Sequence, residues 1–281
     1  MRNRNLIILA LVVVALGAYI YFHERHQPTT EERRQKADTL FPDFDRDEVA
    51  GLEIHNTHGT FRIVKRGEEW RLVEPIDFPA DAPAVSSLLG SLEGLKAERT
   101  LAEGEVDPAA YGLDAPSITV TVSTADGTTA SLEVGDETAL GSNRAVRRTG
   151  ERSVILVGGW FVRDLDKALD QWRSRDLVEL GADEVASLTV LAGADRVQLV
   201  RRGEDWRLLE PLEDVADRDH ARNLIADLDA LRVEEFLESP PPAAELGLDA
   251  PAYRITIVRS SGGDPISLDF GSSRERDGRT Q

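Results

Sequence analysis

A long apolar run, from Leu6 to Phe22, lies near the start of the sequence and contains no charged residue. A membrane-spanning helix needs about 17–25 residues of this kind, so the run is long enough to cross a bilayer. Arg2 and Arg4 precede it, and the positive-inside rule puts such residues in the cytoplasm. The pattern predicts a single-pass anchor in the inner (cytoplasmic) membrane, with the following domains in the periplasm or outside the cell.

A cleaved signal peptide is the alternative interpretation of this run. Its apolar core is then Leu6–Val14, and the small residues Ala15, Gly17 and Ala18 form the cleavage site. The apolar residues continue directly past that site to Phe22, which favours the uncleaved anchor.

After a polar stretch, apolar and polar residues alternate in short segments that turn-forming residues separate. Val49–Ile54, Phe61–Lys65 and Trp70–Glu74 predict three strands. The apolar spacing then becomes helical over Asp81–Lys96, with Asp81 suited to the N-cap. Similar patterns predict four later strands and one long helix: Ile118–Val122, Ser131–Val134, Ala145–Arg148, Val154–Val157 and Trp160–Leu180.

Ten residues of this pattern occur twice, because Arg66–Pro75 returns as Arg202–Pro211 with only two conservative exchanges. A second motif, Gly112–Pro116, returns as Gly247–Pro251, and Asp217 is expected to cap a second helix. Repetition at a nearly constant offset predicts two copies of one domain. Each ten-residue repeat is expected to form a hairpin turn and its outgoing strand, with the tryptophan in the core.

The short spacing between strands implies antiparallel pairing, because parallel strands need long crossovers. The predicted fold class is therefore α+β: an N-terminal transmembrane helix followed by two tandem copies of a mainly antiparallel sheet unit, each with one main packed helix. The expected organisation is a transmembrane anchor over residues 1–26, a polar stalk over 27–44, a first repeat domain over 45–180 and a second over 181–281.

The second repeat domain is expected to be C-terminally incomplete. After Gly271 the sequence has only a short polar tail, whereas the first copy continues through two more predicted strands. A fragment or an early stop is one explanation. The alternative is that a partner chain adds a strand at the open edge of the sheet.

Composition and charge narrow the class of partner. The chain has 281 residues, 41% hydrophobic and 30% charged, which is a globular balance. Its net charge is −18. Because such an acidic surface repels phosphate backbones, no nucleic acid is expected as a partner. The absence of cysteine excludes disulfides, thiolate catalysis and Cys-based zinc sites.

His55 and His58 form a His-x-x-His pair in a predicted turn. Zinc needs three or four ligands, and His220 is the only other histidine of the predicted folded region. Solvated turn histidines are the favoured interpretation, and a metal site is the alternative.

Asp43, Asp45 and Asp47 have the opening spacing of a calcium loop. Such a loop needs Gly at its sixth position and Glu at its twelfth, where this chain has Glu48 and Ile54. Capping and solvation near the first strand are the predicted roles.

Glu74 and Glu210 precede a proline in each copy and form a symmetric acid pair. Ion-paired strand ends are favoured over two active sites. The sequence contains no nucleophile elbow, P-loop or dinucleotide-binding fingerprint. No catalytic, cofactor-binding or metal-ligating residue is predicted, and no cofactor.

The motifs together resemble a bacterial membrane-anchored family that carries the domain of unknown function 4340. The resemblance rests on the short anchor, the Gly-Glu-x-Trp-x-Leu-x-x-Pro hairpin, the Gly-Leu-Asp-x-Pro element before a strand, and the stretch Gln171–Leu177. It covers the chain from Leu6 to about Gly271. Members are similar to proteins encoded beside ABC-type transport systems related to gliding-motility exporters. The resemblance implies an accessory role at such a transporter and supplies no active site.

Two functions are therefore expected. The first is a non-enzymatic, membrane-anchored extracytoplasmic protein that binds or scaffolds partners, including ABC-type transporter subunits. The alternative is an extracytoplasmic enzyme or glycan-binding protein with a site between the two repeats. The small-molecule ligand, if there is one, is not predicted.

Overall fold

The computed structural model describes residues 39–41, 44–138, 142–272, 275–276 and 279–280. The predicted anchor, Leu6–Phe22, lies outside these residues. Among the helices that the structure describes, none is long and apolar enough to span a membrane. The chain divides between Ser174 and Arg175 into two compact units, here unit 1 and unit 2, a few residues before the boundary expected after Leu180.

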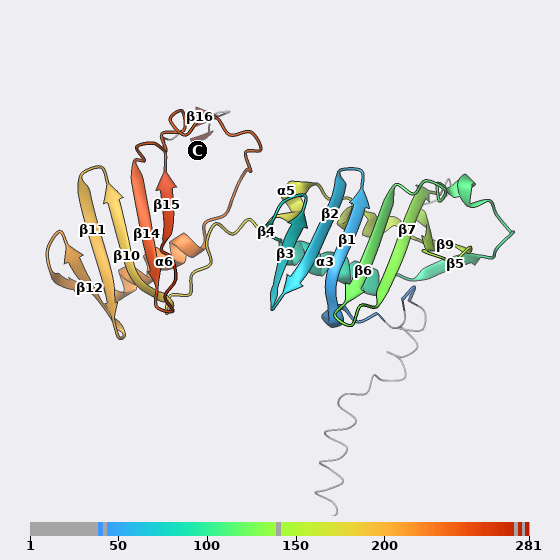
Figure 1. The fold of residues 1–281 in the computed structure, drawn as a ribbon, viewed down its shortest axis with the longest axis horizontal. Coiled ribbons are helices and arrows are strands. Elements are labelled where there is room, and N and C mark those ends of the chain that lie inside the picture. Colours follow the sequence, from blue (N-terminus) through green and yellow to red (C-terminus); the bar gives the residue numbers. More distant parts are fainter. Residues whose placement is uncertain (1–38, 42–43, 139–141, 273–274, 277–278, 281) are drawn as a thin grey trace, which may run out of the picture. The chain divides into compact units, whose positions relative to one another are not determined.

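In the described part of unit 1, nine strands form one sheet in the order β4-β3-β2-β1-β6-β7-β8-β9-β5 (Figure 1). All neighbouring strands in this sheet are antiparallel, as the short turns predict. The strands are β1 (Val49–Asn56), β2 (Gly59–Arg66), β3 (Glu69–Glu74), β4 (Phe78–Pro79), β5 (Ala97–Leu101), β6 (Ile118–Thr124), β7 (Thr129–Glu137), β8 (Asn143–Arg148) and β9 (Val154–Gly158).

One face of this sheet is apolar and carries the core of unit 1. Leu52 lies opposite Ile63 on one side and opposite Val122 on the other, and all three side chains are buried. Facing residues on adjacent strands share a face of the sheet, so these pairs line one apolar surface. Helix α3 (Ala82–Glu93) covers it with a buried stripe that consists of Val85, Leu88, Leu89 and Leu92.

The predicted start of α3 is confirmed. The Asp81 carboxylate accepts a 2.7 Å hydrogen bond from the backbone N–H of Ala84, which is the N-cap geometry. Gly112 ends the short 3-10 helix η2 (Pro108–Tyr111) with a φ of 70°, which glycine adopts without a steric penalty. Two more 3-10 helices are η1 (Arg46–Glu48) and η3 (Gly159–Phe161).

The long helix predicted over Trp160–Leu180 is wrong. The chain forms two short helices there, α4 (Val162–Leu165) and α5 (Leu169–Trp172). It leaves the helical conformation at Asp166, whose carboxylate accepts a 2.7 Å hydrogen bond from the Thr57 hydroxyl at the end of the sheet. The bend lets α4 and α5 follow the apolar face, and so Leu165 and Trp172 both become fully buried.

In the described part of unit 2, six strands form one antiparallel sheet in the order β13-β12-β11-β10-β14-β15 (Figure 1). Helix α6 (Arg218–Asp229) packs on its apolar face, and Asp217 caps the helix as predicted. The strands are β10 (Val185–Ala192), β11 (Asp195–Arg202), β12 (Asp205–Glu210), β13 (Asp214–Ala216), β14 (Tyr253–Arg259) and β15 (Ile266–Phe270); a two-stranded hairpin consists of β16 (Glu275–Arg276) and β17 (Arg279–Thr280).

The repeated ten residues occupy matching places in the two sheets. In each unit they form the turn before β3 or β12 and that strand itself, as predicted, and the following peptide bond to proline is cis. Trp206 is buried, as expected, but Trp70 is only half-buried. Trp70 packs against the edge of the core, with the Lys65 ammonium 5.9 Å from its ring centroid.

Candidate functional site

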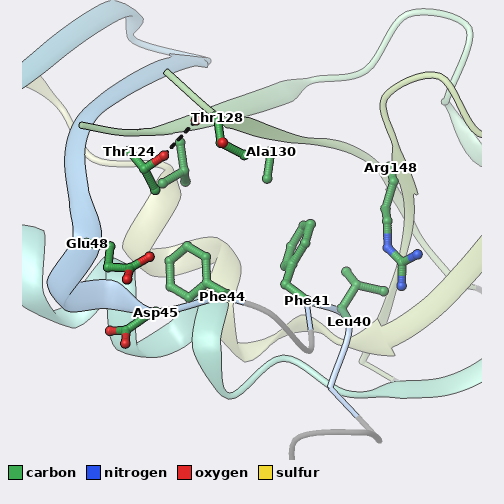
Figure 2. A pocket seen from close by; sticks show the side chains of 10 residues that line it. Leu40, Phe41, Phe44, Asp45, Glu48, Thr124, Thr128, Ala130 and Arg148 are labelled. Carbon is green, nitrogen blue, oxygen red and sulfur yellow. Dashed lines mark hydrogen bonds between the residues drawn. The ribbon is translucent and has the colours of Figure 1, made fainter. Parts of the chain in front are cut away.

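A pocket of about 350 Å³ lies at the edge of the core of unit 1 (Figure 2). The segment before β1 forms one wall, and strands β6, β7 and β8 form the other. Its apolar lining consists of Leu40, Phe41, Phe44, Val122 and Ala130; its polar lining consists of Asp45, Glu48, Thr124, Thr128 and Arg148.

The apolar wall is held in place by backbone and ring contacts. The N–H of Leu40 donates a 2.7 Å hydrogen bond to the carbonyl of Leu95, and Leu40 is only 1% exposed. This bond fixes the chain just before Phe41. The rings of Phe41 and Phe44 lie 6.4 Å apart, a distance at which aromatic pairs attract each other.

Figure 2 shows opposite charges on the two sides of these rings: Arg148 on one side, Asp45 and Glu48 on the other. The Arg148 guanidinium lies 5.9 Å from the centroid of the Phe41 ring, within cation–π range. It also forms a 3.0 Å ion pair with Glu151 through one terminal nitrogen. Its Nε atom is buried and has no hydrogen-bond partner among the residues that the structure describes.

The acidic side of the pocket is built from a helix cap and a turn. Asp45 caps η1 by accepting a 2.9 Å hydrogen bond from the N–H of Asp47, so the predicted capping role of Asp45 is confirmed. Thr124 donates to the Asp126 carboxylate, and that hydrogen bond, with others from Thr128, lowers the pKa of Asp126. The Asp126 carboxylate, which is next to the pocket residues Thr124 and Thr128 but is not part of the lining, therefore keeps its negative charge at neutral pH.

A pocket with this lining is suited to binding. Ligand sites in proteins are typically about 300–1,000 Å³, mostly apolar, with a few placed polar groups. Two aromatic rings and three aliphatic side chains supply the apolar surface here, and Arg148 supplies a guanidinium beside the Phe41 ring.

A second polar cluster lies in the interior of unit 1, around the buried Asp164. Its carboxylate accepts hydrogen bonds from Ser91 at 2.6 Å and Ser87 at 3.1 Å, and it pairs with the Lys167 ammonium at 3.0 Å. The same ammonium lies 5.2 Å from the centroid of the Trp172 ring. The cluster joins α3 to α4.

Asp164 is the buried carboxylate whose charge this cluster stabilises. Burial alone raises the pKa of Asp164, but the hydrogen bonds from Ser91, Lys167 and Ser87 and the charge of Lys167 outweigh it, and the pKa is lowered. Both serines donate to the carboxylate, and their hydroxyls face Asp164 from α3. These hydrogen bonds tie α3 to α4.

The histidines singled out in the sequence do not converge on a metal site. His55 is exposed, and its Nδ1 lies 2.9 Å from the Thr60 hydroxyl; the backbone N–H of His58 donates to the Asn56 side chain. Within the described ranges, no group of three or more His, Cys, Asp or Glu residues is arranged to hold a metal ion. Asp43 lies outside those ranges.

Each of the two glutamates before proline lies near an arginine of the neighbouring strand. Glu210 forms a 2.8 Å ion pair with Arg196, as expected of an ion-paired strand end. Glu74 lies opposite Arg62 in the register of β2 and β3. Neither glutamate lines the pocket.

The sequence did not predict this pocket: of its lining residues, Asp45 and Glu48 were named only in connection with a calcium loop. Phe41 and Phe44 fall in the stretch assigned to the polar stalk, and Arg148 ends a predicted strand. The sequence contains one local indication of the pocket: Leu40, Phe41 and Phe44 form an apolar cluster between polar neighbours. That cluster was too short to show helical or strand periodicity.

The fold and the pocket together define an α+β protein with two antiparallel-sheet units and a mostly apolar pocket in the first. The family model described as Domain of unknown function (DUF4340) matches residues 70–251, which is more than half of the chain. The chain belongs to this family. It matches no curated protein and no solved structure.

Proposed function

We propose that this protein is a non-enzymatic binding component, and that the pocket of unit 1 holds an apolar group of its ligand or partner. The pocket itself carries the proposal: the two rings of Phe41 and Phe44, the buried Leu40 and the guanidinium of Arg148 surround about 350 Å³. Apolar surface brought into such a pocket contributes roughly 25 cal/mol per Å². A partner side chain or a short alkyl chain buried there therefore contributes to the binding of the larger molecule that carries it.

The proposed setting is the outer side of the inner membrane. We infer that Leu6–Phe22 anchors the chain and that both units lie in the periplasm or outside the cell, which the hydropathy of that run supports. The chain between Phe22 and Thr39 reaches at most about 60 Å when fully extended. The pocket, which begins at Leu40, then stays within reach of other proteins in the same membrane.

The proposed partners are subunits of an ABC-type transport system. This part of the proposal rests on the resemblance of the anchor and hairpin motifs to proteins encoded beside such systems. We further propose that the two units are copies of one domain, which the shared strand order and the repeated ten residues support. The pocket then distinguishes unit 1 as the binding copy.

The binding role is tested by filling the pocket. Ala130 faces Val122 across β6 and β7 at its wall, so Ala130→Phe places a ring inside it. Thr129→Phe is the matched control, because Thr129 is the exposed neighbour on the same strand and points to the other face. Three full-length proteins, the unaltered chain and the two variants, are each isolated from the native membrane.

Recovery of transporter subunits with the unaltered chain and with Thr129→Phe, but not with Ala130→Phe, is the expected outcome. Equal recovery with all three proteins shows that the pocket does not hold the partner. If no transporter subunit is recovered with the unaltered chain, the transporter assignment is wrong. The location is tested separately, by the accessibility of the two units to protease in intact spheroplasts.

A further inference from the structure

A second hollow adjoins the pocket of unit 1. Its volume is about 500 Å³, and Glu48 and Thr124 line both spaces. The other charged side chains of this hollow are Asp47, Lys65 and Asp126. The mostly apolar pocket is therefore followed, beyond Glu48 and Thr124, by a polar hollow with three acidic side chains and one basic side chain.

The acidic side chains at this end of the pocket have few counter-ions within the chain. Among the residues that the structure describes, the Glu48 side chain has neither an ion-pair nor a hydrogen-bond partner. The Lys65 ammonium lies 5.9 Å from the centroid of the Trp70 ring, and it pairs with none of the described carboxylates. Negative charge is thus in excess where the two spaces meet.

Unit 2 shows the same place with its charge balanced. Lys65 and Arg201 correspond, because each faces the tryptophan of the repeated ten residues, in β3 and in β12. Asp47 and Asp183 correspond as well, because each stands two residues before β1 or β10. In unit 2 the Arg201 guanidinium forms a 3.0 Å ion pair with Asp183 and also donates to its backbone carbonyl. In unit 1 the lysine leaves its aspartate unpaired.

A second cation of unit 2 is also missing from unit 1. Thr124 faces Val49 at the end of β6, and Arg259 faces Val185 at the end of β14 in the same way. Unit 2 therefore has two guanidinium groups where unit 1 has an ammonium group and a hydroxyl. The acidic end of the pocket in unit 1 is left for a cation that does not belong to the chain.

The aromatic wall of the pocket suits a cation too. The Arg148 guanidinium already lies within cation–π range of the Phe41 ring. Figure 2 shows the ring of Phe44 between Phe41 and the two acidic side chains, Asp45 and Glu48. An aromatic ring beside carboxylates attracts an ammonium group through its π-face and through charge together.

We propose that the pocket of unit 1 binds an amphiphilic cation, that is, an apolar ring or chain that carries an ammonium group. This inference rests on the proposed binding role of the pocket and names the chemistry of the group that it binds. The apolar part packs against Phe41 and Ala130, and the ammonium group lies between Phe44 and Glu48. Arg148, at the opposite end, repels the ammonium group and so sets the orientation.

Three probes with the same aromatic ring test the charge preference: phenethylammonium, the neutral phenethyl alcohol and the anionic hydrocinnamate. Each is titrated into the full chain at neutral pH and followed by ligand-observed NMR. Phenethylammonium is expected to bind about three- to tenfold more tightly than the alcohol, and hydrocinnamate more weakly than both. Ala130→Phe, which fills the pocket, is expected to abolish the binding of all three.

Variants of the acidic end localise the preference. Glu48→Gln removes one charge and is expected to weaken the binding of phenethylammonium by about three- to tenfold, with the alcohol unchanged. Glu53→Gln is the matched control, because Glu53 lies on the exposed face of β1 and the variant changes the net charge by the same amount. It is expected to leave the binding of every probe unchanged. Thr124→Arg adds the cation that unit 2 has and is expected to weaken phenethylammonium at least about tenfold.

A reversal of charge gives a result that a destabilised variant cannot produce. Glu48→Lys is expected to bind hydrocinnamate about three- to tenfold more tightly than the unaltered chain does, and Glu53→Lys is expected not to. The proposal is overturned if the alcohol binds the unaltered chain as tightly as phenethylammonium does, or if the Glu48 variants behave like the Glu53 variants.

The outcome also separates this inference from the proposed function. If Ala130→Phe blocks all probes but charge has no effect, the pocket holds apolar groups and only the cation is wrong. If Ala130→Phe blocks none of them, both proposals fail. Two sources offer the cation, a free amine and a basic side chain of a partner. Excess phenethylammonium releases transporter subunits from the isolated complex if the side chain is the source, and releases none if the source is a free amine.

Discussion

The Ser91 hydroxyl donates a 2.6 Å hydrogen bond to Oδ2 of Asp164 and so joins α3 to α4. The two residues are 6% and 7% exposed, and the carboxylate is also paired with Lys167. Short helices such as α4 bury little apolar area each. A buried, charge-assisted hydrogen bond is directional, and it therefore fixes where α4 lies on α3.

Removal of this carboxylate is expected to destabilise unit 1. Asp164→Ala removes the carboxylate that accepts from two hydroxyls and pairs with the ammonium of Lys167, which costs about 2–4 kcal/mol of the free energy of unfolding. Urea unfolding measures the loss. Asp114→Ala, at an exposed turn residue, is the control and is expected to change the free energy by less than about 0.5 kcal/mol. Equal effects contradict the assigned role.

The Asp164 carboxyl group also makes the free energy of unfolding depend on pH. The pKa of Asp164 is lowered in the folded protein, so the folded state binds its proton less readily than the unfolded chain does. Its contribution is fully present above about pH 4, near the unfolded value, and is lost as the pH falls through the lowered folded value. The stability difference between the unaltered chain and Asp164→Asn is expected to shrink below about pH 4. A difference that stays constant there speaks against the lowered pKa.

Two glycines of unit 1 are expected to respond oppositely to replacement by alanine. A Cβ at Gly135 collides with the backbone carbonyl oxygen of Tyr111, so Gly135→Ala is expected to cost about 1–3 kcal/mol. A Cβ at Gly90 in α3 meets no atom within 4 Å, so Gly90→Ala is expected to stabilise the helix by up to about 1 kcal/mol. Thermal melts of both variants check the signs.

The cap of α3 gives a further prediction. Asp81→Ala removes the acceptor for the N–H of Ala84 and is expected to lower the free energy of unfolding by about 1 kcal/mol. Asp81→Asn keeps a side-chain oxygen that can cap, so it is expected to restore most of that loss. Denaturant midpoints compare the two; an asparagine variant as unstable as the alanine variant contradicts capping as the cause.

The regular part of the fold was predictable from the sequence because it depends on local alternation. Val120 and Val122 alternate with threonines along β6, and the apolar residues alternate with polar ones in the same way along β2. Strand β5 was missed because four of its five residues are exposed and show no apolar alternation. It is a strand because it pairs with β9, a contact between distant residues that local pattern does not encode.

Over residues 160–180 the error is the reverse: local spacing there indicates a regular element that the chain does not form. A continuous helix was expected over Trp160–Leu180, and Phe161, Leu165 and Trp172 are indeed spaced as on one helix. The chain instead turns at Asp166, because its carboxylate bonds to Thr57 on the hairpin end of the sheet. Tertiary hydrogen bonding overrides the helical pattern at this point.

The pocket could not be predicted because its walls come from three distant stretches. Leu40 to Glu48 precede β1, Val122 to Ala130 span the β6–β7 hairpin, and Arg148 ends β8. Only the pairing of β7 with β8 and of β1 with β6 brings them together.

The pocket depends on residues that the family match does not include. That match begins at Trp70, while the rings that line the pocket belong to Phe41 and Phe44. Chains can therefore share the sheets and helices of this family and still differ in what they hold. Relatives sorted by the residues at the positions of Phe41, Phe44 and Arg148 are expected to separate into groups with distinct ligands, and transfer of a role from one member to another is sound only within such a group.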